Sequence, residues 1–361
     1  MFLERLGMKM LLSLDAETAH GLSISAMKSG LVPTCRLSPD PRMAMEIAGL
    51  TFPNPLGMAA GYDKNGEVPD ALLSIGFGFA EAGTVTPLPQ AGNPKPRIFR
   101  LPADHGVINR LGFNNKGHAA CLSRMEARRD KGGVVGINIG ANKDSSDRVA
   151  DYVKGIETFA HVASYFTINV SSPNTPGLRN LQSRESLADL LSRAKLARDD
   201  AAGKYGRSVP LFLKVAPDLS EEELDDIASE VLDKGTDGLI VSNTTLSRDG
   251  LSDSETGKQA GGLSGRPVFA RSTTVLAKLR QRVGPALPII GVGGVENGET
   301  AMEKIRAGAD LVQLYSCMIY SGPRLPAMIL REMSSILDRE NMVSIRDMRG
   351  TRTAYWADKR L

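Results

Sequence analysis

Eight short apolar runs recur along the chain, and a stretch with helical periodicity separates most of them from the next. The runs are Pro55–Ala60, Gly78–Thr84, Val134–Ile139, Phe166–Val170, Leu211–Val215, Gly238–Ser242, Pro288–Gly291 and Leu311–Leu314. Strands that alternate with helices form a parallel sheet, because each helix carries the chain back to the start of the next strand. We therefore expect a (β/α)8 TIM barrel. An open doubly wound sheet is the alternative, but its glycine fingerprint is absent after the first run.

Local signals between the runs support helices and one hairpin. In the segment 146–164, six residues lie on one face at helical spacing: Val149, Tyr152, Val153, Ile156, Phe159 and Ala160. Ser220 and Glu223 form a capping box, and Gly235 and Gly308 end two of the helices. Residues 43–52 predict a hairpin that turns at Ala48-Gly49 and closes the barrel bottom. Residues 85–113 are an insertion rich in Pro and Gly, and residues 243–264 are expected to form a long polar loop.

Charge and cysteine usage exclude several classes of function. A formal net charge of +3 is too weak to predict a nucleic-acid partner. The three cysteines show neither the spacing of metal ligands nor a disulfide framework. We therefore expect a reducing compartment and no bound metal. None of the four histidines ends a strand beside an acid, so no Ser-His-Asp arrangement is visible. The first 30 residues contain no apolar run long enough to span a bilayer, although they can lie on one.

Polar residues replace apolar ones abruptly where the predicted strands end. Barrel enzymes build their active sites at these carboxyl ends. Glycines at 261–265 and 291–294, with Tyr315 and Ser316, come late in the chain, where barrels bind phosphate. Five amides suit a flat ligand with imide groups, and two strand-end lysines add positive charge: Asn109, Asn138, Asn169, Asn174 and Asn243, with Lys64 and Lys214. Ordinary turns and solvated lysines are the plainer explanation of each feature alone. Together they favour redox chemistry on a phosphate-bearing organic cofactor.

These motifs together resemble the dihydroorotate dehydrogenase family, in the family's order and over nearly the whole chain. The segments that carry the resemblance are AAGYDKNGE, NPKPRIFRLP, INRLGFNNKG, INVSSPNTPGLRNLQ, LKVAPDL, SNTTLSRDG, AGGLSGRP, IIGVGGV and LVQLYS. They fit the quinone-dependent, membrane-associated class 2. The soluble class 1 uses a cysteine as base, and no cysteine lies near SSPN here. Tyr62 departs from the pattern, because we expect an aliphatic residue at that position.

The resemblance implies that the barrel binds FMN and oxidises dihydroorotate to orotate in pyrimidine biosynthesis, with a membrane quinone as final electron acceptor. Ser172 is then the catalytic base, with Thr175 or a water as its partner, and Phe113 excludes bulk water. The implied substrate contacts are Lys64, Asn109, Arg110, Leu111, Gly112, Phe113, Asn169, Asn174, Asn243 and Thr244. The implied FMN contacts are Ala60, Gly61, Tyr62, Asp63, Lys64, Thr84, Asn138, Asn169, Lys214, Ser242, Gly265, Gly294, Tyr315 and Ser316.

The N-terminal segment predicts two helices. Apolar residues line one face of the first: Phe2, Leu3, Leu6, Met10 and Leu14. Asp15 caps the second, whose inward residues are Ala19, Leu22 and Ala26. The pair is either a cover for the barrel or, as the resemblance implies, a funnel that admits quinone. The implied quinone contacts are His20, Arg100 and Tyr315.

We therefore expect a membrane-associating segment at residues 1–32 and a barrel at residues 33–361. The resemblance implies a monomer, bound peripherally to the cytoplasmic face of a bacterial inner membrane. Three alternatives remain: a soluble flavoprotein that reduces fumarate or an iron–sulfur partner, a flavin-dependent RNA modifier, and a silent phosphate-binding barrel. The RNA modifier requires a basic face and a cysteine that acts as an acid in the site, and neither is evident in the sequence. The silent barrel has no need of Ser172, Lys64 and the asparagines together.

Overall fold

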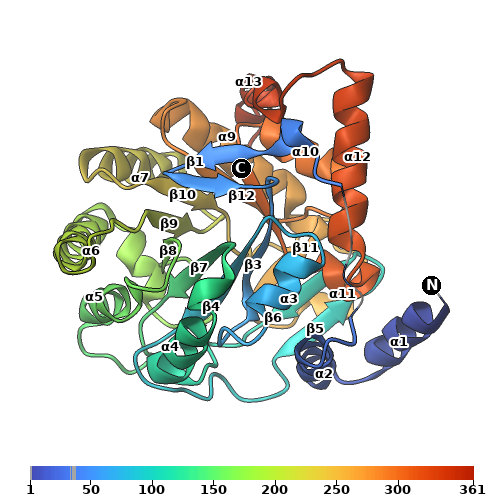
Figure 1. Ribbon diagram of the computed structural model, residues 1–361, viewed down its shortest axis with the longest axis horizontal. Coiled ribbons are helices and arrows are strands. Elements are labelled where there is room, and N and C mark those ends of the chain that lie inside the picture. Colours follow the sequence, from blue (N-terminus) through green and yellow to red (C-terminus); the bar gives the residue numbers. More distant parts are fainter. Residues whose placement is uncertain (1, 33, 35–37) are drawn as a thin grey trace.

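The computed structural model describes residues 2–32, 34 and 38–361, and the side chains of residues 2–6 lie outside this description. Within these residues, eight parallel strands close into a barrel with helices on its outside (Figure 1). In order around the barrel, the strands are β10 (Gly238–Val241), β12 (Ile289–Val292), β13 (Leu311–Leu314), β3 (Leu56–Asp63), β4 (Phe79–Val85), β7 (Val134–Ile139), β8 (Phe166–Asn169) and β9 (Leu211–Val215). The predicted (β/α)8 barrel is confirmed.

Helices connect the strands and pack against the outside of the barrel. They are α3 (Pro69–Ser74), α4 (Gly117–Ala127), α5 (Arg148–Phe159), α6 (Arg184–Tyr205), α7 (Glu221–Asp233), α9 (Phe269–Val283), α10 (Gly298–Arg306) and α12 (Leu325–Arg339), with the shorter α8 (Ser254–Gly257), α11 (Cys317–Ser321) and α13 (Thr353–Ala357). Short 3-10 turns lie at Pro41–Met43, Arg129–Lys131, Leu178–Gln182, Arg266–Val268 and Ile345–Met348. The predicted face of α5 is buried except for the partly buried Val153, and the capping box of Ser220 and Glu223 is present at α7.

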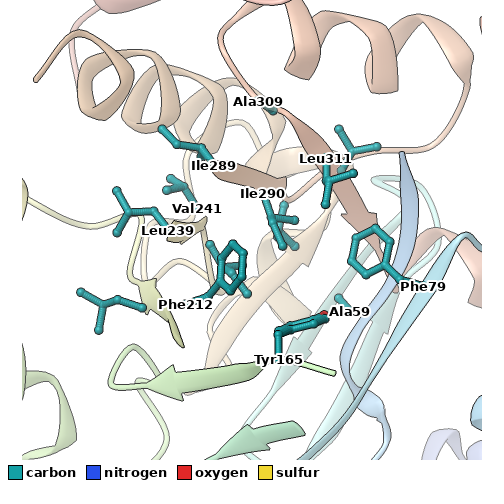
Figure 2. Close-up of a cluster of buried hydrophobic side chains, with 14 of the residues drawn as sticks. Ala59, Phe79, Tyr165, Phe212, Leu239, Val241, Ile289, Ile290, Ala309 and Leu311 are labelled. Carbon is teal, nitrogen blue, oxygen red and sulfur yellow. The ribbon is translucent and has the colours of Figure 1, made fainter. Parts of the chain in front are cut away.

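A layer of aromatic rings fills the barrel interior near the amino ends of the strands (Figure 2). The rings of Phe79, Tyr165 and Phe212 are buried there, and neighbouring rings meet edge to face. Each ring fills the space beside a glycine of a neighbouring strand. A Cβ at Gly57 would overlap the Phe79 ring, one at Gly136 the Tyr165 ring, and one at Gly238 the Phe212 ring. The barrel is therefore solid at this end, and a ligand has room only at the other.

The predicted hairpin is confirmed as β1 (Met45–Ile47) and β2 (Leu50–Phe52). Ala48 and Gly49 both have positive φ at the turn. The Phe52 ring packs edge to face on Phe79 at the start of β4, so the hairpin lies at the closed end of the barrel.

The two insertions form a second sheet that the sequence pattern did not predict. β5 (Ile98–Leu101) pairs with β6 (Gly106–Asn109), and β6 pairs with β11 (Gly262–Gly265), both antiparallel. The expectation of a continuous polar loop at residues 243–264 is therefore wrong. The strand β11 forms because it finds a partner more than 150 residues away, and no local pattern announces such a pairing.

The N-terminal helices α1 (Phe2–Ser13) and α2 (Ala16–Lys28) lie at one side of the barrel, and α2 contacts β5 (Figure 1). Asp15 caps α2 as predicted, because its carboxylate accepts from two backbone N–H groups. Ala19 and Met27 form its buried face. The prediction for Leu22 is wrong, because this residue is 48% exposed. Around the helix it lies about 60° from Ala19 on one side, whereas Met27 lies about 80° from Ala19 on the other.

Candidate active site

A cavity of about 640 Å³ lies at the carboxyl ends of the barrel strands and extends to the N-terminal helices. Most residues predicted from the sequence line it. They are Ser172, Lys64, Asn109, Leu111, Gly112, Phe113, Asn169, Asn174, Asn243, Thr244, Ala60, Gly61, Tyr62, Thr84, Lys214, Ser242, Gly265, Gly294, Tyr315, Ser316, His20 and Arg100. The strand-end pattern and the family resemblance together thus identify residues that are far apart in the chain but surround one space.

Three predicted contact residues do not line the cavity. The Asp63 carboxylate accepts hydrogen bonds from the backbone N–H groups of Glu67 and Val68, so it shapes the turn after β3. The Arg110 guanidinium turns outward, donates to Gln259 and the Pro96 carbonyl, and lies over the Phe99 ring. The side chains of Asp63 and Arg110 thus have other partners in this structure, and the predicted ligand contacts of these two residues stay predictions.

Asn138, the third of them, lies directly behind the cavity wall. Its Oδ1 accepts from the hydroxyl of Thr84 at 2.5 Å and from the amide of Asn169 at 3.2 Å. Its Nδ2 donates to the buried Glu81 carboxylate at 2.6 Å. Because Glu81 accepts only, the amide of Asn138 is fixed with its oxygen toward Thr84. Asn138 therefore orients the lining residues without facing the ligand space itself.

The remaining asparagines form a second, connected group in the wall. Asn169 Oδ1 accepts from Ser171 Oγ at 2.9 Å, and Asn243 Nδ2 donates to the same Ser171 Oγ at 2.9 Å. Across the cavity mouth, Asn174 Nδ2 donates to Asn109 Oδ1 at 3.3 Å. These contacts hold four amides around one space, where they present both donors and acceptors.

Ser172 faces the cavity from the turn that follows β8. Its side chain is buried, and its Oγ accepts a hydrogen bond from the Asn174 backbone N–H at 3.3 Å. That contact leaves the hydroxyl proton free to point into the cavity. Thr175, its suggested partner, is buried in the same turn and is not among the lining residues.

Several polar groups in the wall have no protein partner. The Thr244 hydroxyl and the Asn114 side-chain oxygen are buried without a hydrogen bond among the described residues. Lys214 is also buried, and its ammonium makes no hydrogen bond to any described residue. Burial lowers the pKa of Lys214. Buried polar groups are almost always paired in proteins, so this wall has the chemistry of a site for a polar ligand.

Lys64 joins the wall that carries the asparagines to the N-terminal helices. Its Nζ lies 3.2 Å from His20 Nε2, and Tyr315 Oη lies 3.5 Å from His20 Nδ1. Burial lowers the pKa of His20 to about 3, so the imidazole is neutral and accepts from the ammonium. Burial also lowers the pKa of Lys64 to about 8. The Tyr62 ring packs against His20 and Tyr315, and its hydroxyl contacts Ser23, which explains how a tyrosine is accommodated at this position.

Glycines and hydroxyls form the opposite end of the cavity. Gly265 and Gly294 have positive φ, and a Cβ at either would overlap backbone atoms of a neighbouring segment. Ser316 Oγ donates to Ser264 Oγ at 2.8 Å beside them. The Arg266 guanidinium is paired with Glu296 at 2.8 Å, so it carries little net charge toward this end. An anion can approach the backbone closely here.

The third side of the cavity is apolar and is formed by the N-terminal helices. Met8 and Leu11 of α1 line it with Ala19 of α2. Arg100 holds α1 in place, because its guanidinium donates to the carbonyls of Leu11, Leu12 and Leu14.

Met10 on α1 and Leu14, which directly follows α1, are 62% and 39% exposed, whereas the side chains of Phe2, Leu3 and Leu6 lie outside the described residues. The cavity thus reaches helices that also expose apolar side chains to solvent.

Sequence reasoning missed some residues of this site. Met8, Leu11 and Ser23 line the cavity from the helical side. The sequence of these short helices does not show which of their residues face the cavity and which face solvent. Glu81 lies in the middle of an otherwise apolar run, and this interruption was the available signal. The buried Glu81 carboxylate accepts from Asn138, Tyr165 and Gln313, so it organises the layer beneath the cavity.

Two further features bear on the site. Among the described residues, no group of three or more His, Cys, Asp or Glu side chains is arranged to hold a metal ion. In the same part of the chain, no helix has both the length and the apolar character needed to cross a bilayer.

Comparison with known proteins identifies the family. A model of the family described as dihydroorotate dehydrogenase matches residues 42–337. A curated protein of Rhizobium rhizogenes, named dihydroorotate dehydrogenase (quinone), is 67% identical over 356 residues, which cover 99% of this chain and 98% of that protein. A protein of the same name from Rhizobium meliloti is 65% identical over 357 residues, with the same coverage of 99% and 98%.

Solved structures agree with the sequence comparison. The ligand-free DHODH of Eimeria tenella superposes with a TM-score of 0.89 at 40% identity, over 93% of this chain and 99% of that one. The same enzyme in complex with ferulenol also gives a TM-score of 0.89, at 39% identity over 93% and 95% of the two chains. The resemblance drawn from the motifs is therefore confirmed, and this chain belongs to the dihydroorotate dehydrogenase family.

Proposed function

We propose that this chain oxidises dihydroorotate to orotate, the redox step of pyrimidine biosynthesis, and passes the electrons through FMN to a membrane quinone. One observation carries the proposal. Four asparagines, Ser172 and Lys64 surround one end of the cavity. The other sides are a glycine cradle, formed by Gly265, Gly293 and Gly294, and the apolar residues of α1 and α2. Family membership supports the same reaction, and the names of the curated relatives specify quinone as the acceptor.

The substrate ring suits the amide wall. Dihydroorotate carries imide N–H and C=O groups, and the amides of Asn109, Asn169, Asn174 and Asn243 offer complementary donors and acceptors. The unpaired Thr244 hydroxyl gains a partner when such a ring binds. The Lys64 ammonium suits the carboxylate. Backbone groups of the segment 109–113 complete the contacts, since the side chain of Arg110 turns away.

Ser172 takes the proton that leaves the substrate carbon. Its Oγ is held by the Asn174 N–H, so the hydroxyl is oriented before the substrate arrives. A serine is a weak base at neutral pH, and it therefore acts while the hydride leaves, passing its own proton to Thr175 or a water. Phe113, which lines the cavity with positive φ, keeps bulk water away from this transfer.

FMN supplies the hydride acceptor when it is bound. The residues that would hold it are the glycine cradle of Gly265 and Gly294 for the phosphate, with Ser316 beside it, and Thr84, Asn169 and Lys214 for the ring. The buried, unpaired ammonium of Lys214 fits an electron-rich ring edge. Ala60, Gly61, Tyr62, Ser242 and Tyr315 line the remaining walls, and Asn138 fixes the orientation of Thr84 and Asn169.

Residues 1–32 form the membrane-associating segment and residues 33–361 the catalytic barrel in this proposal. A helix with exposed apolar side chains binds at the lipid interface, and Met10 of α1 and Leu14 directly after it are exposed in this way. Quinone then enters between α1 and α2 and meets His20 and Tyr315. Arg100 contributes mainly by holding α1, because its guanidinium already binds three carbonyls of that segment. We propose a monomer on the cytoplasmic face of a bacterial inner membrane.

The test is anaerobic reduction of the purified protein by dihydroorotate, followed by reoxidation with quinone, fumarate or NAD offered separately. We expect a yellow protein that releases FMN on denaturation, is bleached by dihydroorotate and is reoxidised fastest by quinone. A protein that dihydroorotate does not reduce would contradict the proposed reaction. Faster reoxidation by fumarate or NAD would contradict the acceptor alone.

A further inference from the structure

Lys304 is a fully buried lysine to which the proposed reaction assigns no role. It lies on α10, and its side chain is 0% exposed. Its Nζ donates to Ser272 Oγ at 2.6 Å and lies 5.1 Å from the centre of the Phe269 ring. No carboxylate among the described residues pairs with it. Burial alone holds the pKa of Lys304 well below its ordinary value, because no anion is near enough to offset the loss of solvent.

The hydrogen bond from Lys304 to Ser272 leads to the glycine cradle. Ser272 belongs to the first turn of α9, and its Oγ lies 3.2 Å from the carbonyl oxygen of Gly293 and 3.1 Å from that of Phe269. The hydroxyl can donate to these carbonyls while it accepts from the lysine. Lys304 therefore polarises the hydroxyl that holds the Gly293 carbonyl.

The loop that Ser272 holds lies against the start of α9. Gly293 and Gly294 have φ values of 113° and 74°, a region that favours glycine. A Cβ at Gly294 would overlap Phe269, so the loop and the helix are in direct contact. Both glycines also line the cavity. The same loop thus has the ligand space on one side and Ser272, with Lys304 behind it, on the other.

The charge around this end of the cavity leaves an anion uncompensated. Arg266 lines it, but Glu296 neutralises this guanidinium at 2.8 Å. The hydroxyls of Ser264 and Ser316 also lie at this end, as does His105, whose Nδ1 is 3.0 Å from the Arg266 guanidinium. Arg266, the arginine at this end, is thus already paired, and Lys304 has no carboxylate partner among the described residues. In a low-dielectric interior, a phosphate and a buried ammonium stabilise each other even without direct contact.

We propose that Lys304 is a positioning residue for the flavin phosphate: its ammonium, behind the glycine cradle, holds the Gly293–Gly294 loop through Ser272 and supplies the countercharge to the phosphate. The inference rests on the proposed binding of FMN and adds a residue outside the cavity to it. Lys304 recognises the phosphate and not the ring, so it selects phosphorylated flavin over riboflavin.

The experiment compares the dissociation constants of FMN and riboflavin for apoprotein, measured by quenching of flavin fluorescence. Lys304→Met removes the charge and keeps most of the volume. We expect FMN affinity to fall by about tenfold or more, as for loss of a charge pair at an effective dielectric near 20. Riboflavin affinity should change by less than about twofold, because riboflavin has no phosphate to interact with this charge.

Two variants serve as companions. Ser272→Ala makes a smaller change in the core and removes the link between Lys304 and Gly293, so it should lower the preference for FMN in the same direction. It keeps the inference testable if Lys304→Met fails to fold. Lys278→Met is the matched control, because Lys278 lies on α9, as Ser272 does, but its ammonium is paired with Glu221 at 2.7 Å and neither residue lines the cavity. It should leave both dissociation constants unchanged.

The outcomes separate this inference from the proposed function. A wild-type protein that does not bind FMN would overturn the proposed cofactor and this inference with it. If wild type binds FMN, an unchanged preference in Lys304→Met, or in Ser272→Ala when the first variant does not fold, refutes the role of Lys304 alone. Equal losses for FMN and riboflavin also refute it, because they indicate a general packing defect.

Discussion

Raising the pH from about 7 to about 9 should weaken orotate binding by about tenfold, because it removes the proton from Lys64. Burial lowers the pKa of this lysine to about 8 in the free protein. The neighbouring His20 has a pKa lowered to about 3, so it stays neutral throughout and does not alter this titration. Below about pH 8 the ammonium is present and attracts the carboxylate, and above it the lysine is neutral.

The sign and size follow from linkage. A bound carboxylate favours the protonated form, so above the pKa each binding event must first restore the proton to Lys64. The apparent dissociation constant therefore rises by about tenfold for each pH unit well above about 8, and is nearly constant well below it. The assay is a titration of the oxidised protein with orotate, followed by the change in flavin absorbance, at several pH values and constant ionic strength.

The matched variant is Lys64→Met, which has no titrating group at this position. It should bind orotate more weakly than wild type at neutral pH, with an affinity that no longer follows the titration of a lysine. Flavin content is checked at each pH, since loss of cofactor would imitate loss of binding. A flat wild-type profile between about pH 7 and pH 9 would refute the reasoning, as would a slope that persists in Lys64→Met.

Three further outcomes are expected. Ser172→Ala should leave orotate affinity nearly unchanged and slow flavin reduction in stopped-flow by about 10²–10⁴-fold, and a rate within about threefold of wild type would assign the base elsewhere. Deletion of residues 2 to about 30 should abolish reduction of a long-tailed quinone and binding to vesicles. The flavin of the truncated protein should still be reduced by dihydroorotate, and full quinone activity in it would refute the funnel. Asp310→Ala should lower the free energy of urea unfolding by about 3–5 kcal/mol, because it leaves the buried Arg280 without its partner at 2.7 Å. The exposed Lys258–Glu255 pair supplies the control, since Glu255→Ala should change the unfolding free energy by less than about 1 kcal/mol.

The strands could be predicted from the sequence because each is a short buried run with polar residues directly after it. The bounds predicted for β7, β9 and β13 agree with the structure residue for residue. The run that predicts β3 ends at Ala60, whereas the strand continues to Asp63. The strand continues past Gly61, whose φ is 102°, with a shift of register against β4 between Met58 and Asp63. The side chains there no longer look like those of a buried strand.

The site could be predicted as a set of positions, but not always as a set of side-chain directions. A motif assigns a residue to the neighbourhood of a ligand through its backbone, and the side chain then follows its own nearest partners. Asp63 turns to the amides of its own loop, and Arg110 to carbonyl and amide oxygens outside the cavity. Leu22 fails for a related reason, because one apolar residue does not show which side of a short helix is covered.

The rings that close the barrel floor restrict how this sequence can change over time. Phe79 occupies the place of a side chain at Gly57, Tyr165 that at Gly136, and Phe212 that at Gly238. A larger residue at one of these glycines fits only if the facing ring becomes smaller, and the two positions lie on different strands. Single steps in either order pass through an overlap or a hole, both of which are destabilising. Each glycine and its facing ring therefore form a pair of positions whose residues are expected to change together.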